Sequence, residues 1–400
     1  MCMKRAIYLA GLGQEMYPMS LRDYAQRLSK ALDEEDPVAS NAYKAEISEM
    51  EYSQEGLSVD VVTISKSSEQ DEKIVYKLYN FDYAQFLTSN YSDANILKRF
   101  LVLCLVLLAR FPSLMKSFFD FNFHIKKRSK IQASYFLIIY AVLGMYLLFL
   151  IPSVLSVLNG MMDQSGDTVN NSWFGEFLNW IEPVASGIVT SFAVTMMLSP
   201  ASKTIFAKTA IEYLGANQYL STGEQRQKIL GKLSKLIEEI IEKEGEDIKI
   251  ELHGYSFGSV IAFDALFPKE SPPSTRIKNC ITSFCTIGFP LDYIEIYWDN
   301  YFSNRVYDGL SLVDWKNIWS ETDVLSSSLD NDKTKKLSLI KDEQFWETLS
   351  FREYSYNIFD SNSVGYLELF MFYGIRAHSM YWDRHSDSKS CLVYLAKNDN

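Results

Sequence analysis

The order of apolar and polar positions predicts strands and helices in both end regions of the chain, residues 1–95 and 210–400. Residues 247–252, DIKIEL, alternate between polar and apolar side chains, which favours a strand. Residues 223–245 place Ile and Leu along one side at helical spacing, which favours an amphipathic helix. Further strands are expected in short apolar runs at residues 5–10, 57–65, 74–79, 281–289 and 314–319.

The first end region also contains a helical pattern followed by a polar stretch. Ser20 is placed to cap a helix that runs to about Glu35, because Leu21 and Leu28 fall on the same face of it. Residues 36–55 are mostly polar, so we expect a loop there.

The middle of the chain holds two long stretches without a charge. Residues 135–158 are long enough to cross the roughly 30 Å hydrocarbon core of a bilayer. Residues 183–200 are milder and contain small residues that suit packing on a neighbouring helix. The loop between them is acidic, whereas the outer flanks are basic, which predicts a transmembrane hairpin with both flanks in the cytoplasm. The alternative is a helical hairpin inside a large soluble core.

A third apolar run, residues 100–109, is too short to cross a bilayer before it meets Arg110 and Pro112. Lysine and arginine residues surround it, so we expect a segment of about residues 96–119 to lie in the membrane interface. A third span would also put the two end regions on opposite sides of the membrane.

Composition narrows the class of protein. The chain has 400 residues and a net charge of -11, which disfavours a long-range attraction to nucleic acid. The N-terminal apolar run is too short for a secretory signal, and thiols without disulfide spacing suggest a reducing compartment. The five cysteines are scattered and none has the spacing of a metal site: Cys2, Cys104, Cys280, Cys285 and Cys391.

The strongest chemical signal is the stretch HGYSFGS at residues 253–259. It places Ser256 between Gly254 and Gly258, after the expected strand and before the apolar helix-like run SVIAFDALF. Strand, tight turn and helix form the context that a G-x-S-x-G nucleophile elbow requires, and the glycines leave room for the close packing there. The alternative is an ordinary turn in which Ser256 caps the helix.

With this turn the chain resembles the α/β-hydrolase superfamily, and within it the lipase-like and esterase-like serine hydrolases. The resemblance covers roughly residues 4–90 and 210–395. It implies one domain with a mostly parallel sheet and helices on both faces. That domain would combine residues 1–95 and 210–400 around a membrane-associated insertion at residues 96–209. It also implies that a serine, an acid and a histidine follow one another along the chain.

The implied order requires a histidine after Ser256, which leaves His378 and His385 of the four histidines. His378 is followed by the aromatic pair Tyr381 and Trp382, and this resembles the family's histidine loop. His385 is expected to be solvent-exposed and remains the alternative.

The acid is less strongly specified because carboxylates are common. Residues 314–319 resemble the Trp-x-Asn strand of several lipase-like hydrolases, and Asp323 matches the acid that follows it. In an open parallel sheet, sites assemble at the carboxyl ends of the strands. The alternatives are Glu321, Asp308 and Asp292, or a loop carboxylate that is simply solvated.

An oxyanion hole would need two backbone donors. The Phe257 N–H is expected to be the first, because it follows the nucleophile. The family commonly has His-Gly after its first strand, where this chain has Ala10 and Gly11, and the second donor is expected at Leu12. A nucleotide loop at residues 11–16, GLGQEM, is disfavoured because it lacks the third glycine of G-x-G-x-x-G and the lysine of a P-loop.

These features predict a membrane-anchored serine hydrolase that cleaves an acyl ester or thioester, with a membrane lipid as the expected substrate and the catalytic domain on the cytoplasmic side. Ser256 would attack the carbonyl, His378 would move the proton, and Asp323 would orient the histidine. The bilayer is the expected partner, and no metal or organic cofactor is implied. Three alternatives remain: an anchored esterase or peptidase with a soluble substrate, a non-catalytic signalling or scaffold protein with a hydrolase-like fold, and a membrane-perturbing effector.

Overall fold

The computed structural model describes residues 3–12, 21–36, 42–51, 58–67, 72–88, 96–119, 137, 200–269, 271–298, 301–306, 313–329, 350–356, 377–382 and 390–397. The chain divides into two compact units. The first combines residues 1–106 and 211–400, and the second is residues 107–210. The sheet described below lies in the first unit.

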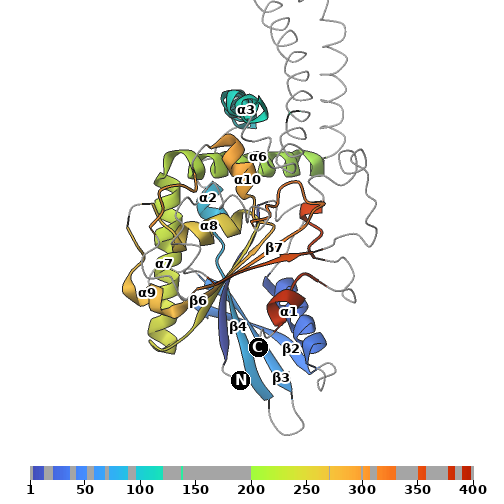
Figure 1. The fold of residues 1–400 in the computed structure, drawn as a ribbon, viewed down its shortest axis with the longest axis vertical. Coiled ribbons are helices and arrows are strands. Elements are labelled where there is room, and N and C mark those ends of the chain that lie inside the picture. The colour runs from blue at the N-terminus through green and yellow to red at the C-terminus, as the bar shows by residue number, and fades with distance from the viewer. Residues whose placement is uncertain are drawn as a thin grey trace, which may run out of the picture. The chain divides into compact units, whose positions relative to one another are not determined.

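One eight-stranded sheet forms the centre of the first unit, in the order β2-β3-β4-β1-β5-β6-β7-β8 (Figure 1). From β4 through β8 every neighbouring pair is parallel, whereas β2 and β3 add antiparallel strands at one edge. The predicted α/β fold with a mostly parallel sheet is confirmed at this level. The strands are β1 (Lys4–Leu9), β2 (Tyr43–Glu51), β3 (Ser58–Ser67), β4 (Glu72–Asn80), β5 (Ile250–Tyr255), β6 (Ile281–Ile287), β7 (Asp314–Trp319) and β8 (Ser350–Ser355).

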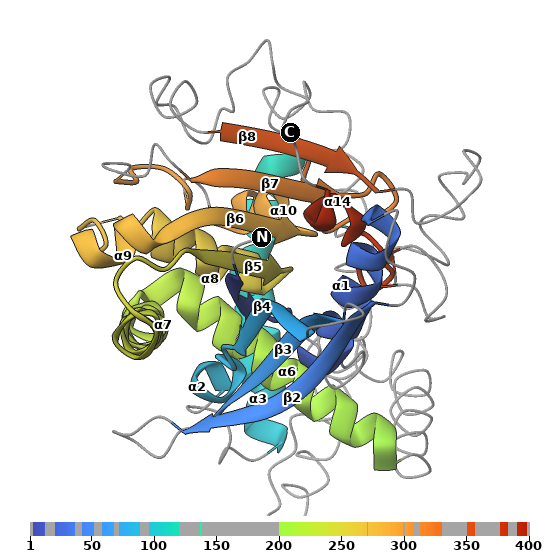
Figure 2. The same ribbon diagram turned by 90° about the horizontal axis from the view of Figure 1, so that it is seen from below.

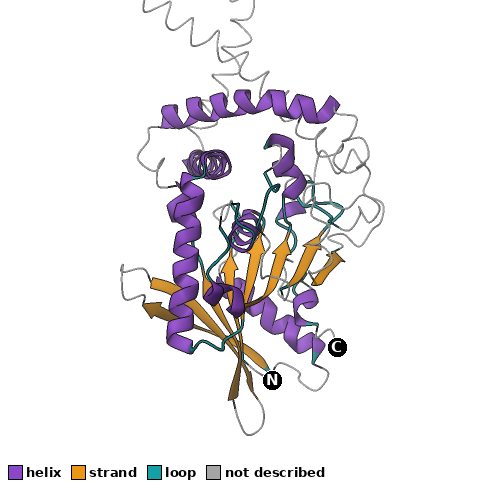
Figure 3. Cartoon of the chain, turned by 60° about the vertical axis from the view of Figure 1, so that its left-hand side comes forward, coloured by secondary structure: helices purple, strands orange, loops and turns teal. Residues whose placement is uncertain are grey.

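Helices cover both faces of this sheet, as predicted, and Figures 2 and 3 show the two layers. On one face, α1 (Leu21–Glu35) packs against the strands and against α14 (Val393–Ala396). On the other face, α8 (Phe257–Leu266) contacts β1, β5 and β6, and α7 (Glu224–Glu244) packs on α8. Both faces of the central strands are therefore buried, which explains why they are rich in apolar residues. The remaining helices are α2 (Ala84–Thr88), α3 (Ile96–Phe119), α6 (Pro200–Thr222), α9 (Thr275–Cys280) and α10 (Leu291–Tyr297).

A buried ion pair anchors α8, the helix that follows the serine turn at residues 253–259. Asp264 of α8 lies 2.7 Å from the Arg305 guanidinium and accepts a 2.9 Å hydrogen bond from the Tyr219 hydroxyl of α6. The carboxylate and the guanidinium are both buried, so removal of either partner would leave an uncompensated charge inside the protein. This network holds α8 in place from the end opposite to Ser256.

Two predictions about local structure need correction. Residues 36–55 were expected to form a loop, but β2 occupies Tyr43–Glu51. This strand lies at the edge of the sheet with Ile47 half-exposed, so its polar side chains remain in solvent and the stretch does not look like a buried strand. The expected strand at residues 247–252 begins at Ile250 instead and continues to Tyr255.

Three cysteines of the described part, Cys280, Cys285 and Cys391, are buried and free.

The expected transmembrane segments, residues 135–158 and 183–200, lie outside the described residues except for Leu137 and Pro200. Within the part of the chain that the structure describes, no helix combines the length and the hydropathy of a membrane span. The short apolar run at residues 100–109 belongs to α3, which continues through Arg110 and Pro112 to Phe119. The hairpin therefore stays a prediction from the sequence.

Candidate active site

Ser256 occupies the turn between β5 and α8, where its backbone adopts φ 53° and ψ -122°. A positive φ is uncommon for a residue other than glycine and stores strain that the surrounding structure must hold. The Ser256 N–H donates to the Ile287 carbonyl at 2.8 Å, and the Ser256 carbonyl accepts from the Ser259 N–H at 3.0 Å. These bonds fix the turn to the end of β6 and to the start of α8.

The two glycines around Ser256 are required because the turn packs against other backbone. A Cβ on Gly258 would overlap the carbonyl oxygens of Leu9 and Ala10, at the end of β1. A Cβ on Gly254 would overlap the Ser259 backbone. The spacing G-x-S-x-G is thus a steric consequence of placing β1, β5 and α8 close together, as the sequence predicted.

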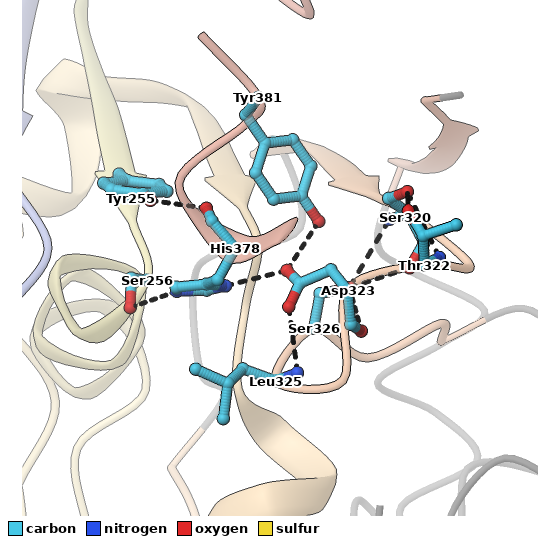
Figure 4. Close-up of polar contacts among 9 residues, drawn as sticks. All are labelled: Tyr255, Ser256, Ser320, Thr322, Asp323, Leu325, Ser326, His378 and Tyr381. Carbon is cyan, nitrogen blue, oxygen red and sulfur yellow. Dashed lines mark hydrogen bonds and ion pairs between the residues drawn. The ribbon is translucent and has the colours of Figure 1, made fainter. Parts of the chain in front are cut away.

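Ser256, His378 and Asp323 form one line of hydrogen bonds, which Figure 4 shows in close-up. The His378 Nε2 lies 2.6 Å from the Ser256 Oγ, and the His378 Nδ1 lies 2.7 Å from the Asp323 Oδ2. Asp323 is fully buried, whereas Ser256 and His378 keep 9% and 8% of their surface exposed. The structure therefore brings the three predicted residues together at an edge that retains contact with the exterior.

The Asp323 carboxylate is held by two further donors. The Leu325 N–H donates to Oδ1 at 2.9 Å, and the Tyr381 hydroxyl donates to Oδ2 at 3.0 Å. Burial alone would raise the pKa of Asp323, but the adjacent His378 imidazole and these hydrogen bonds outweigh burial and hold the pKa below its ordinary value. Asp323 is therefore an ionised acceptor for the His378 Nδ1–H at neutral pH.

His378 is held on its other side by Tyr255, the residue before the serine. The two rings are stacked with centroids 5.4 Å apart, and the Tyr255 hydroxyl donates to the His378 carbonyl at 2.6 Å. Burial, and then the charge of Asp323, raise the pKa of Tyr255 well above its ordinary value, so this hydroxyl remains a donor. Gly288 lies under the imidazole with φ +61°, and a Cβ there would come within 3.0 Å of the His378 Cε1.

A second buried polar chain positions the loop that carries Asp323. The Trp315 indole N–H donates to the Thr286 hydroxyl at 3.0 Å, and that hydroxyl donates to the Asn317 side-chain oxygen at 2.8 Å. The Asn317 amide in turn donates to the Ser327 carbonyl at 3.1 Å. The Trp-x-Asn pattern of β7 therefore acts by linking β6 to the loop after β7.

The expected oxyanion donors lie beside the serine. Phe257 is the first residue of α8, and the first N–H groups of a helix have no acceptor within the helix. Leu12 follows Gly11. A Cβ on Gly11 would lie 2.9 Å from the Ser256 Cβ, so the backbone after β1 packs closely against Ser256. The geometry agrees with a donor at Phe257, and the donor at Leu12 stays a prediction.

The alternative site residues differ in their positions. Glu321 is exposed, and Asp292 is buried in α10, where its N–H bonds to the Ser327 Oγ. His385 and Asp308 lie outside the described residues. His253 is buried between the Tyr24 hydroxyl, at 2.8 Å, and Glu251, at 3.1 Å, and its ring nitrogens are occupied by these contacts.

The hydroxyl contacts of Tyr255 and Tyr381 were not predicted. Tyr255 lies inside the serine motif and Tyr381 follows His378 by three positions, but neither position is specific for a hydrogen bond to another segment.

Among the described residues, no cluster of three or more His, Cys, Asp or Glu side chains could hold a metal ion. Comparisons with protein-family models, with curated proteins and with solved structures found no match for this chain.

Proposed function

We propose that this chain is a serine hydrolase that cleaves an acyl ester or thioester. The observation that supports it is the continuous line from the Ser256 hydroxyl through the His378 imidazole to the Asp323 carboxylate. A strained serine, a histidine within hydrogen-bond reach and a third group that orients the histidine are the parts of an activated nucleophile.

In the proposed reaction, the Ser256 Oγ attacks the acyl carbonyl while the His378 Nε2 accepts the hydroxyl proton. The ionised Asp323 stabilises the imidazolium that forms. The proton then passes to the leaving alcohol or thiol, which departs and leaves an acyl-serine. Water, deprotonated by the same nitrogen, attacks the acyl-serine. The bond from the acyl carbon to the Ser256 Oγ then breaks, His378 returns the proton to that oxygen, and the carboxylic acid leaves. The Phe257 N–H, with a second donor at Leu12, would stabilise the negative oxygen in both steps.

We assign the domain to the α/β-hydrolase type within this proposal. The order Ser256, Asp323, His378 along the chain is the order that this fold uses. The serine follows the central strand β5, the acid follows β7, and the histidine comes after β8. All three residues thus come after strands of the parallel part of the sheet, and sites form at the carboxyl ends of such strands in open α/β sheets.

A membrane lipid is the substrate class that we propose. The uncharged residues 135–158 and 183–200 support a tether to the bilayer, with the catalytic domain on the cytoplasmic side. Exposed apolar side chains on α3, including Leu105 at 56%, support a second contact with lipid. Tethering would keep acyl chains at a high effective concentration near Ser256.

The test is acyl-ester hydrolysis by the full chain in detergent and in phospholipid vesicles. The substrates are 4-nitrophenyl esters of short and long acids and a phospholipid with a fluorogenic acyl chain. Wild type should hydrolyse both kinds, with preference for long acyl chains and for vesicles, and Ser256→Ala should hydrolyse neither. Activity on short soluble esters alone would remove the lipid assignment. A folded wild-type chain without any esterase activity would contradict the enzyme itself.

A further inference from the structure

One oxygen of the Asp323 carboxylate serves two donors from the same segment of chain. Oδ2 accepts from the His378 Nδ1–H at 2.7 Å and from the Tyr381 hydroxyl at 3.0 Å. The other oxygen accepts from the Leu325 N–H at 2.9 Å. The Tyr381 hydroxyl and His378 therefore compete for the same negative charge (Figure 4).

The position of this hydroxyl is closely constrained. Tyr381 is fully buried, and its ring meets His378 edge-on at 89° with centroids 6.3 Å apart. The Tyr356 ring stacks on it at 6.2 Å, and a Cβ on Gly288 would come within 3.1 Å of it. A ring packed in this way loses little conformational freedom when its hydroxyl bonds to the carboxylate, so the contact persists.

We infer that Tyr381 is a positioning residue that sets the basicity of His378 by sharing the Asp323 Oδ2. This inference rests on the proposed function for its catalytic meaning, but the effect on the imidazole exists whether or not the chain is an enzyme. The hydroxyl serves two purposes. It orients the carboxylate toward Nδ1, and it withdraws part of the negative charge that stabilises the imidazolium.

The direction of the effect follows from the groups that face the imidazole. Among the described residues these are Asp323 from the loop after β7, Tyr255 and Ser256 from the end of β5, and Tyr381 from its own segment. Asp323 is the carboxylate among them, and its Oδ2 lies 2.7 Å from the imidazole Nδ1. Without the Tyr381 hydroxyl, that carboxylate would hold the Nδ1 proton more tightly, so His378 would take up its second proton at a higher pH.

The experiment follows this protonation directly by NMR of the full chain labelled with ¹³C at the histidine Cε1. The chain has four histidines, and His378→Gln identifies the signal of interest by its loss. In Tyr381→Phe, we expect the titration midpoint of this signal to rise by about half to one pH unit. The acid limb of the pH–rate profile should move by the same amount, and kcat should fall roughly tenfold with KM unchanged.

Two further variants make the test sharper. Tyr356→Phe removes the hydroxyl of the ring that stacks on Tyr381 and should leave the His378 midpoint unchanged. Site-specific 3-fluorotyrosine at position 381 provides a stronger donor of nearly the same shape, and it should lower the midpoint. This second substitution keeps the inference testable if Tyr381→Phe lowers the melting temperature too far for a titration.

The outcomes separate the inference from the proposed function. Equal midpoints in wild type, Tyr381→Phe and the fluorotyrosine protein would overturn the inference, even with an active wild type. A midpoint that shifts in opposite directions in the two variants supports the inference, even if the wild type hydrolyses no ester. A loss of activity without any shift in the midpoint would give Tyr381 a structural role only and would also overturn it.

Discussion

The His378 Nε2 lies 2.6 Å from the Ser256 Oγ, although 122 positions of chain separate the two residues. The serine comes from the turn after β5, and the histidine from a short segment that comes after β8 in the chain. Gly288, at the end of β6, lies against the imidazole and leaves it the space that it occupies. Segments that follow three different strands of one sheet, β5, β6 and β8, thus determine one contact between two side chains.

Replacement of the acid should abolish most of the turnover without unfolding the protein. In Asp323→Asn the amide must direct its NH₂ group at one of the donors, either Leu325 N–H or the pair formed by His378 and Tyr381. When the NH₂ group faces the Nδ1–H, the imidazole loses its acceptor and adopts the wrong tautomer, so kcat should fall about 10³- to 10⁴-fold. Esterase kinetics of the purified variant measure this. Full activity would exclude Asp323 from the relay.

The glycine beside His378 should also support activity, because it leaves space for the imidazole. Gly288→Ala places a Cβ 3.0 Å from the His378 Cε1, on a backbone with φ +61° that an alanine adopts at a cost of about 1–2 kcal/mol. The imidazole must shift, and we expect kcat to fall at least tenfold, with a melting temperature lower by a few degrees.

A matched glycine controls for this substitution. Gly231 lies inside α7, and a Cβ there would meet nothing within 4 Å. Gly231→Ala should keep full activity and raise the stability by up to about 1 kcal/mol, because alanine favours a helix. Equal kinetics for the two variants would show that Gly288 does not support the imidazole.

Acid sensitivity should depend on Glu251, which lies near the start of β5, at the end of the strand opposite to Ser256. Burial raises its pKa, but His253, Lys4 and the Tyr76 hydroxyl outweigh burial and lower the pKa to about 2. A carboxylate with a lowered pKa stabilises the folded state above its unfolded value of about 4.3 and loses this contribution as the pH falls toward 2. The contribution is roughly 3 kcal/mol, at about 1.4 kcal/mol for each unit of pKa.

Urea unfolding of wild type and Glu251→Gln between pH 7 and pH 3 measures this contribution. The variant should be less stable at pH 7 by roughly that amount, and its stability should depend less on pH below about 4.5. The two proteins should approach each other at the acid end. A constant difference across the whole range would mean that the Glu251 charge contributes nothing.

The parts of the fold that could be predicted depend on local causes. The glycines around Ser256 follow from contacts that any such turn between β1 and α8 must make, so a short motif carries them. Apolar runs predicted the central strands because those strands are buried on both faces. The polar edge strand β2 was missed for the converse reason, since its side chains face solvent and its pairing with β3 leaves no mark on its own sequence.

The candidate site shows the same division. Ser256 could be found from its motif. His378 could be found because the chain has few histidines and the resemblance implies a histidine after the serine, and Asp323 depended on the resemblance as well. The Tyr381 hydroxyl bonds to Asp323, 58 positions away, and the Tyr255 hydroxyl bonds to the His378 carbonyl, 123 positions away. No local sequence pattern predicts contacts between segments so far apart in the chain. Residues that orient a catalytic group could therefore be identified only from the three-dimensional structure.

Covalent labelling of the nucleophile is the most direct measurement of the central claim. A fluorophosphonate probe reacts with a serine hydroxyl only when a neighbouring base activates it, so the full chain in detergent should bind one probe at Ser256. Peptide mass spectrometry locates the adduct. Ser259→Ala, three positions away, should label as wild type does, and Ser256→Ala should not label at all. An unlabelled, folded wild type, or an adduct that persists in Ser256→Ala, would contradict the account.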